Sequence, residues 1–195
     1  MSSRDHDPGA ATGELAACAA ERLRRLASSV AGRRPLLAEA VQFDLAWLAD
    51  GKFLSAMDAE LKAKARRGTC SIYEFVAPDE AIYGLLGAAY ERRPVTRASD
   101  GKRLQYSRSM DPVRPRALYV GSGRDLPGRI GQHLGRIGGA GTYCMRMALW
   151  ASGVEGALEL RYWTYAPDMN PIELEALEQE LWDARTPLLG KRSGR

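Results

Sequence analysis

The feature that most constrains the fold is a change of sequence pattern near residue 70. Before it, apolar residues recur every three or four positions in an Ala-rich background, which predicts helices. Residues 70–76 are instead rich in β-branched and aromatic side chains and predict a strand. Two further strands are predicted at 116–120 and at 157–165, where apolar and polar residues alternate.

Helices are predicted between and after these strands. The last of them is the most clearly signalled, because Asn170, Pro171 and Glu173 form a capping-box pattern at its start. The order of elements predicts an α/β (α+β) domain with a small mixed or antiparallel three-stranded sheet flanked by helices. The predicted helices cover residues 13–30, 35–49, 54–66, 78–92, 126–137 and 170–184, with a short one at 142–151.

This pattern divides the chain into segments with different expected roles. Residues 1–12 are polar and are expected to be a disordered tail, and 13–68 a helical N-terminal extension. Residues 69–190 form the predicted main domain, with an insertion over 77–115 between its first two strands. Residues 191–195 form a basic tail.

Composition excludes several classes of protein. Hydrophobic residues make up 45% of the 195, but no apolar run of about 18 occurs, so no membrane span is predicted. Neither a signal nor a transit peptide precedes the first helix, and a cytoplasmic location is expected. Three scattered cysteines and two histidines do not compose a zinc or disulfide framework. The formal net charge is +4, with clustered Arg and Lys that suit a phosphate backbone or, alternatively, a solvated surface.

Two predicted helices carry side chains that are suited to metal or phosphate binding. In the last helix, Glu178 lies on the rim of an apolar face, where a carboxylate needs a metal ion or an arginine beside it. In the middle helix, Arg129, His133 and Arg136 follow one another at i, i+4 and i+7 beside an apolar stripe. Such a face suits a phosphate group. A flanking salt bridge and a solvated basic face are the alternatives.

The strand residues connect these two helices to a known family. Ser71-Ile72-Tyr73 and Tyr119-Val120-Gly121 resemble the two tyrosine motifs of the GIY-YIG nuclease superfamily. In that family an arginine follows the second tyrosine by ten residues and a histidine or tyrosine follows the arginine by four, as Arg129 and His133 do. The family glutamate precedes a proline by nine residues, as Glu178 precedes Pro187. The resemblance covers residues 70–190.

The chain departs from the family pattern at three points. Ser71 replaces the first glycine, and Gly190 stands where an asparagine is common. The two tyrosine motifs are also far apart, because 46 positions separate Tyr73 from Tyr119 (119 − 73 = 46), a layout that resembles GIY-YIG restriction enzymes. Tyr83 is an alternative first tyrosine. Tyr73 is preferred because the family tyrosine lies on a strand and Tyr83 falls in a predicted helix.

The resemblance implies a metal-dependent DNA endonuclease, restriction-like on duplex DNA. It implies Mg²⁺ at Glu178, with Mn²⁺ as a substitute, Arg129 on the scissile phosphate, and Tyr73 as the base for the attacking water. Tyr119 and His133 would orient that water or relay its proton. The alternatives are a repair or mobile-element nuclease on branched or nicked DNA, and a catalytically silent DNA-binding module; a homodimer is a further option. The residues expected to contact DNA are Arg92, Arg93, Arg97, Lys102, Arg103, Arg114, Arg116 and Arg136.

Overall fold

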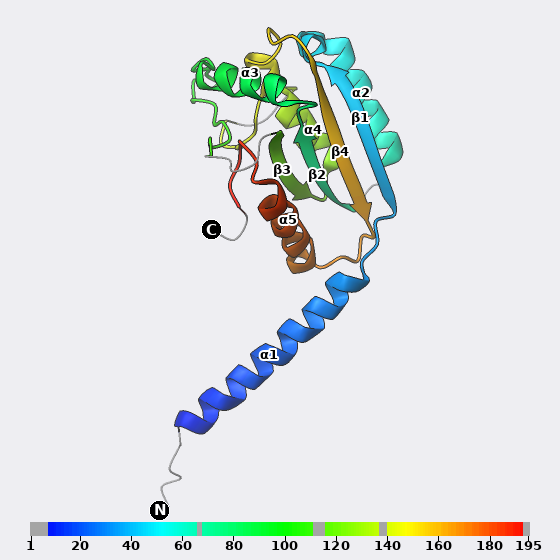
Figure 1. Ribbon diagram of the computed structural model, residues 1–195, viewed down its shortest axis with the longest axis vertical. Helices are drawn as coiled ribbons and strands as arrows, with labels where there is room; N and C mark the ends of the chain where they lie inside the picture. Colours follow the sequence, from blue (N-terminus) through cyan, green and yellow to red (C-terminus); the bar gives the residue numbers. More distant parts are fainter. Residues whose placement is uncertain (1–7, 66–67, 111–115, 137–139, 193–195) are drawn as a thin grey trace, which may run out of the picture. The chain divides into compact units, whose positions relative to one another are not determined.

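The computed structural model describes residues 8–65, 68–110, 116–136 and 140–192, and Figure 1 follows its helices and strands along the chain. The chain separates into two compact units, residues 1–34 and 35–195. The first contains the helix α1 (Pro8–Gly32). This helix starts earlier than the predicted tail 1–12 allows, because proline is favourable in a first helical turn and alanines follow it. Residues 1–7 of that tail lie outside the described residues.

The second unit is built on a four-stranded sheet with the order β1-β4-β2-β3, in which every neighbouring pair is antiparallel. The predicted mixed α/β class is confirmed, with one strand more than expected. Strand β3 is at one edge of the sheet, and because its side chains alternate between the two faces, helices on both faces can reach them. The strands are β1 (Leu37–Asp44), β2 (Cys70–Val76), β3 (Ala117–Gly123) and β4 (Ala157–Tyr165).

Strand β1 corrects the sequence prediction, which placed a helix over 35–49 inside an extension ending at residue 68. The segment pairs with β4 along its whole length, from Leu37 opposite Thr164 to Asp44 opposite Ala157. Its alternate side chains are exposed, which is the period of a strand. Ala, Leu and Glu favour a helix locally, but pairing and burial against β4 outweigh that preference. Residues 35–68 therefore belong to the main unit.

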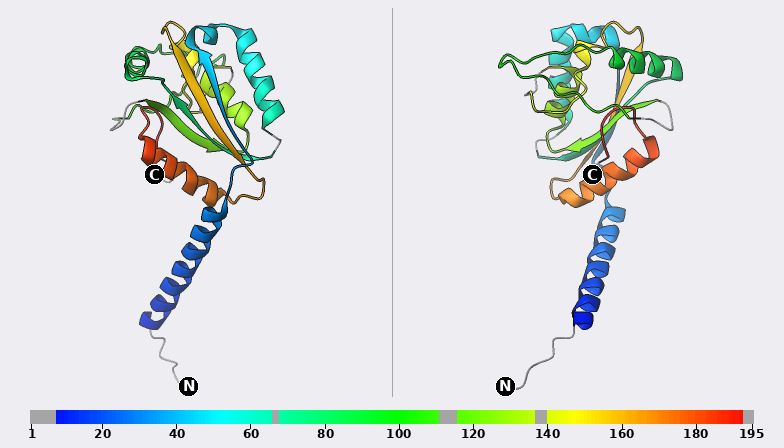
Figure 2. Two further views of the ribbon diagram at one scale, coloured as in Figure 1. Left: turned by 45° about the vertical axis from the view of Figure 1, so that its right-hand side comes forward. Right: turned by 90° about the vertical axis from the view of Figure 1, so that its left-hand side faces the viewer.

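The helices of this unit lie on both faces of the sheet, as Figure 2 shows. Helix α2 (Gly51–Lys64) packs against α4 (Leu126–Leu134) on one face, and α5 (Pro171–Arg185) packs on β2 and β3 on the other. Helix α3 (Glu80–Glu91) belongs to the insertion between β2 and β3. None of the helices in the described part of the chain combines the length and apolar character that a membrane span requires. Short 3₁₀ helices are η1 (Leu45–Ala49) and η2 (Met147–Leu149).

Capping residues explain where the site-bearing helices start and stop. Asp125 caps α4, and Gly135 ends it at φ +107, a left-handed conformation that suits glycine. The helix is therefore shorter than the predicted 126–137. The helix expected over 142–151 is also shorter, because only η2 forms there. The capping box predicted at Asn170 and Glu173 is present and starts α5.

Successive residues of β2 enter different parts of the core. Tyr73 and Phe75 belong to a buried cluster with Ile130 of α4, whereas Ile72 belongs to a second cluster with Leu174 of α5. This alternation follows from the two-residue period of a strand. The alternation also determines which residues can meet in the site, because residues of β2 and β3 that are paired in the register face the same helix.

The insertion returns to the sheet through an extended segment ending near residue 110. The N–H of Ser107 donates to the carbonyl of Cys144 at 3.1 Å, and the N–H of Gly190 donates to the carbonyl of Arg108 at 2.8 Å. The residues after α5 also run along the start of β3, where the N–H of Leu189 donates to the carbonyl of Leu118 at 2.9 Å. Three loops distant in sequence are thus joined beside the edge strand.

Candidate active site

Two tyrosines lie side by side on the face of the sheet covered by α4. Gly121 is directly opposite Tyr73 in the β2–β3 register, and Tyr119 precedes Gly121 by two residues, so all three face the same side. The tyrosine rings are stacked, with centroids 6.2 Å apart and planes 14° apart. A Cβ atom at Gly121 would lie 2.7 Å from the Tyr73 hydroxyl and 2.8 Å from Cε1 of Tyr119. The glycine therefore makes room for both rings.

Tyr83, the alternative first tyrosine, is part of helix α3 rather than of a strand. Within the described residues, the ring contacts of Tyr119 and His133 are made with Tyr73 and not with Tyr83. The strand tyrosine is thus the one that lies beside the other candidate residues.

Helix α4 places His133 and Arg129 one turn apart against these rings. His133 is fully buried, and its Nδ1 accepts a hydrogen bond from the backbone N–H of Met145 at 3.2 Å. Because a backbone N–H can only donate, the proton of a neutral imidazole lies on Nε2. That atom is 3.1 Å from the Tyr73 hydroxyl, to which it donates. Arg129 lies nearby, with Nη2 3.5 Å from His133 Nε2 and Nη1 donating to Gln132 Oε1 at 2.6 Å.

Burial dominates the proton affinities of these groups. Burial, together with the Arg129 charge, holds the pKa of His133 well below its usual value, so this imidazole is neutral near pH 7. Burial raises the pKa of Tyr73 and of Tyr119, and the positive charge of Arg129 offsets part of that rise. Both tyrosines are therefore protonated, and a lower pKa for either requires further positive charge beside it.

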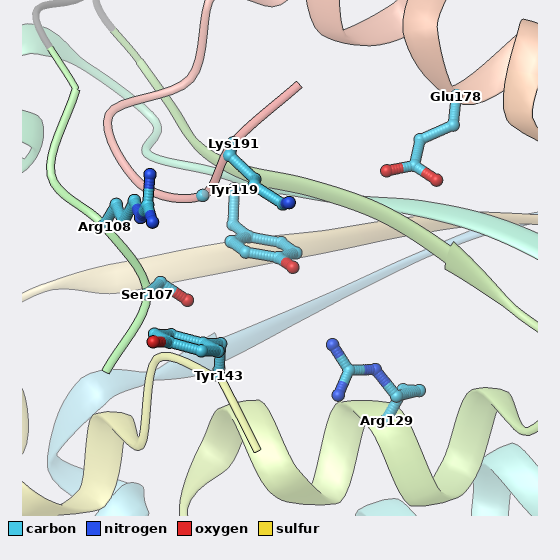
Figure 3. A pocket seen from close by; sticks show the side chains of 8 residues that line it. Ser107, Arg108, Tyr119, Arg129, Tyr143, Glu178 and Lys191 are labelled. Carbon is cyan, nitrogen blue, oxygen red and sulfur yellow. The ribbon is translucent and has the colours of Figure 1, made fainter. Parts of the chain in front are cut away.

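Glu178 reaches the same place from the opposite face of the sheet. It lies on α5, and the Ser122 hydroxyl of the edge strand β3 donates to its carboxylate. Glu178, Tyr119 and Arg129 line one cavity of about 280 Å³. Figure 3 shows the Arg129 and Glu178 side chains on the same side of the Tyr119 ring, one from α4 and the other from α5. Tyr73 and His133 are not among the lining residues and are packed behind Tyr119.

A magnesium ion fits this donor set. The described residues contain no cluster of three or more His, Cys, Asp or Glu side chains of the kind that encloses a metal ion. Magnesium does not require one, because it is commonly bound by one or two carboxylates, with water and substrate phosphate completing its shell. Glu178 is the carboxylate that would hold it, and the Ser122 hydroxyl bond orients that carboxylate.

The cavity also has lining residues that sequence reasoning missed. Ser107, Arg108 and Tyr143 come from loops whose approach to the site depends on backbone pairing, and no motif indicates them. Lys191 belongs to the predicted basic tail, and its positive charge is the sequence feature that could have indicated a place in the site. Gly190 has φ +118 and lies against the Tyr119 ring, which accounts for a glycine at this position.

The residues expected to contact DNA lie elsewhere, and several already have partners. The Arg93 guanidinium stacks over the Tyr90 ring at 4.1 Å, and Arg136 forms an ion pair with Asp58 of α2. Arg97 donates to the Gly101 carbonyl, Lys102 pairs with Asp100, and Arg116 donates to the Pro78 carbonyl. Arg92 and Arg103 are exposed, and Arg114 lies outside the described residues. None of the described members of this set lines the cavity at Tyr119.

Comparisons of the chain with protein-family models, with curated proteins and with solved structures found no match. The functional assignment therefore depends on the geometry of the site and on the sequence motifs.

Proposed function

We propose that this chain is a magnesium-dependent endonuclease that hydrolyses phosphodiester bonds, and that its substrate is duplex DNA, as for a restriction enzyme. The observation that supports this most strongly is the convergence of Tyr119, Arg129 and Glu178 on one cavity, with Tyr73 and His133 packed directly behind. These are the five residues to which the resemblance to GIY-YIG nucleases assigns catalysis. They come from four separate elements of the fold.

The charges of the cavity suit the transition state of this reaction. Magnesium bound at Glu178 would supply Lewis-acid stabilisation of the negative charge that develops on the phosphate and the leaving oxygen. Arg129 lies across the cavity from Glu178, where its forked donors can bind the scissile phosphate. Its hydrogen bond to Gln132 at 2.6 Å orients the guanidinium before the substrate arrives.

The two tyrosines have different access to a water molecule. Tyr119 lines the cavity, whereas Tyr73 is completely buried. We therefore assign contact with the attacking water to the Tyr119 hydroxyl. Tyr73 then holds the position of Tyr119 and of Arg129, and His133 holds that of Tyr73 through its Nε2 proton. This assignment revises the expectation that Tyr73 itself is the base.

The proposal is tested by digesting supercoiled plasmid, linear duplex and branched DNA with the wild-type protein in Mg²⁺ and in Mn²⁺. Glu178→Ala should abolish cleavage but retain DNA binding, because it removes the metal ligand and leaves every cationic side chain of the protein in place. Glu180→Ala, an exposed carboxylate of the same helix, is the matched control and should cut as wild type does. Equal activity of Glu178→Ala and wild type would refute the metal-ligand assignment.

The same assay separates the alternative functions. Cleavage of branched or nicked DNA but not of intact duplex would favour a repair or mobile-element nuclease. Binding without any cleavage in either metal would favour a catalytically silent DNA-binding module.

A further inference from the structure

The cavity extends beyond the residues that the proposed reaction uses. In the view of Figure 3, Arg129 and Glu178 lie on one side of Tyr119, and Ser107, Arg108 and Tyr143 lie on the other. Lys191 lies beside Tyr119 and belongs to the same lining. The cavity thus contains two cationic side chains and a second tyrosine that have no role in the steps described above.

Backbone pairing holds these three loops together. Besides the Ser107–Cys144 and Gly190–Arg108 hydrogen bonds, the N–H of Met110 donates to the carbonyl of Leu188 at 2.7 Å. The ring of Tyr90 supports the same segment, because its hydroxyl donates to the carbonyl of Ser107. The backbone positions of Arg108, Tyr143 and Lys191 are therefore set by the fold. This preorganisation lowers the entropy cost of binding a ligand there.

The side chains of this part of the cavity suit a phosphate group. The Arg108 side chain is exposed and makes no hydrogen bond or ion pair with any residue that the structure describes. Tyr143 is 54% exposed, so its hydroxyl and ring edge are accessible. A guanidinium, an ammonium and a phenol are three of the donors that proteins use on nucleic-acid phosphates.

We propose that Arg108, Lys191 and Tyr143 form a second phosphate subsite, which binds the phosphodiester next to the one that is cut. This inference rests on the proposed nuclease function. Because both subsites share one cavity, the two phosphates they hold belong to consecutive nucleotides of one strand. Arg108 and Lys191 neutralise the flanking phosphate, and the Tyr143 hydroxyl donates to it while the ring packs on the deoxyribose. The subsite fixes the register of the strand so that the scissile phosphate lies between Arg129 and Glu178.

The test combines protein variants with DNA in which single phosphates are replaced by neutral methylphosphonates. The wild type should lose about tenfold in kcat/KM when the flanking phosphate is neutralised, since a hydrogen bond to a charged group is worth about 1.5 kcal/mol or more. The double variant Arg108→Ala, Lys191→Ala should lose a similar factor on unmodified DNA. It should then be insensitive to the methylphosphonate at that one position. Its binding should also fall less steeply with salt, by about 0.9 in log–log slope for one lost duplex phosphate contact.

Matched variants show whether the loss is local. Lys52→Ala removes an exposed cation that does not line the cavity, and it should keep the wild-type methylphosphonate profile. Arg108→Lys keeps the charge and should recover most of the binding, which separates phosphate binding from a folding defect. If the double variant keeps wild-type sensitivity at every phosphate, the subsite is refuted, while cleavage by the wild type and its loss in Glu178→Ala leave the nuclease proposal standing. Absence of cleavage by the wild type overturns both.

Discussion

Replacing Arg129 with alanine or with lysine distinguishes the effect of its positive charge from that of the geometry of its hydrogen-bond donors. Its guanidinium lines the cavity and is oriented by Gln132. Arg129→Ala should lower the single-turnover cleavage rate by at least about 100-fold, because removing a donor that stabilises a developing charge typically costs that much. Arg129→Lys should recover little of the rate, since an ammonium group cannot reproduce the fork of donors. Near wild-type cleavage by the lysine variant would contradict the assigned role.

His133 should make the stability of the protein dependent on pH. Its folded-state pKa is depressed by burial and by Arg129, whereas in the unfolded chain it is about 6.5. The unfolded state therefore binds the proton more readily. The contribution to stability is complete above about pH 6.5 and is lost as the pH falls from there through the folded-state pKa.

Thermal melting at pH 7.5 and at pH 5 measures this effect. His133→Asn should reduce the difference between the two melting temperatures, because its amide oxygen can still accept from Met145 N–H but does not titrate. An unchanged difference in this variant would assign the pH dependence to other groups.

Single residues also show how far the site can be predicted from the sequence. Tyr73, Tyr119, Arg129, His133 and Glu178 were predicted from their resemblance to the short motifs of GIY-YIG nucleases, and in the structure they lie close together. Arg108 and Tyr143 were missed because they reach the cavity from loops that are distant in sequence. Ser122 was missed because its contact with Glu178 depends on how α5 packs on β3. The charge clusters favoured Arg93 and the helix face favoured Arg136, although these side chains are engaged with Tyr90 and Asp58.

At the scale of elements, the β2–β3 pair determines whether the tyrosines fit. A methyl group at Gly121 would overlap both rings, whereas at Gly123 its nearest neighbour would be Cγ of Arg129 at 3.6 Å, an ordinary contact. Gly121→Ala should therefore lower the melting temperature and the cleavage rate, because the tyrosines must move. Gly123→Ala is the matched control and should keep both close to wild type. Equal melting temperatures of the two variants would contradict this packing argument.

The fold was predicted well where local and tertiary preferences agree. Residues 70–76 and 157–165 were predicted as strands with the bounds that the structure has, because β-branched and aromatic residues also bury well in a sheet. Strand β1 was not, since its Ala, Leu and Glu residues favour a helix and only β4, distant in sequence, makes it a strand. Such long-range pairing leaves no local signal.

At the scale of the whole molecule, the insertion between β2 and β3 has two regions with different expected roles. Ser107 and Arg108 reach the cavity, whereas Arg92, Lys102 and Arg103 are exposed outside it. Alanine at these three exposed positions should weaken duplex binding and reduce its salt dependence, while cleavage at saturating DNA stays close to wild type. Arg93 is left in place because its guanidinium donates to the Tyr90 carbonyl at 2.7 Å.

A salt titration of binding, followed by cleavage at saturating DNA, measures both effects. If the triple variant binds duplex DNA as wild type does at every salt concentration, this surface does not contact DNA. Contacts outside the cavity would then be sought in residues 13–67 and at the cations that this variant retains, Arg97, Arg114 and Arg116.

The strand order has a consequence for the moment during synthesis at which the candidate site is completed. Strand β1 is held in the sheet through β4 alone, and Glu178 and Lys191 follow β4 in the chain. When synthesis has reached α4 but not β4, the nascent chain carries both tyrosines and Arg129, and the strand that joins β1 to the sheet and the Glu178 carboxylate are still to be added. Any nuclease activity therefore has to wait until late in synthesis, after α5 has left the exit tunnel.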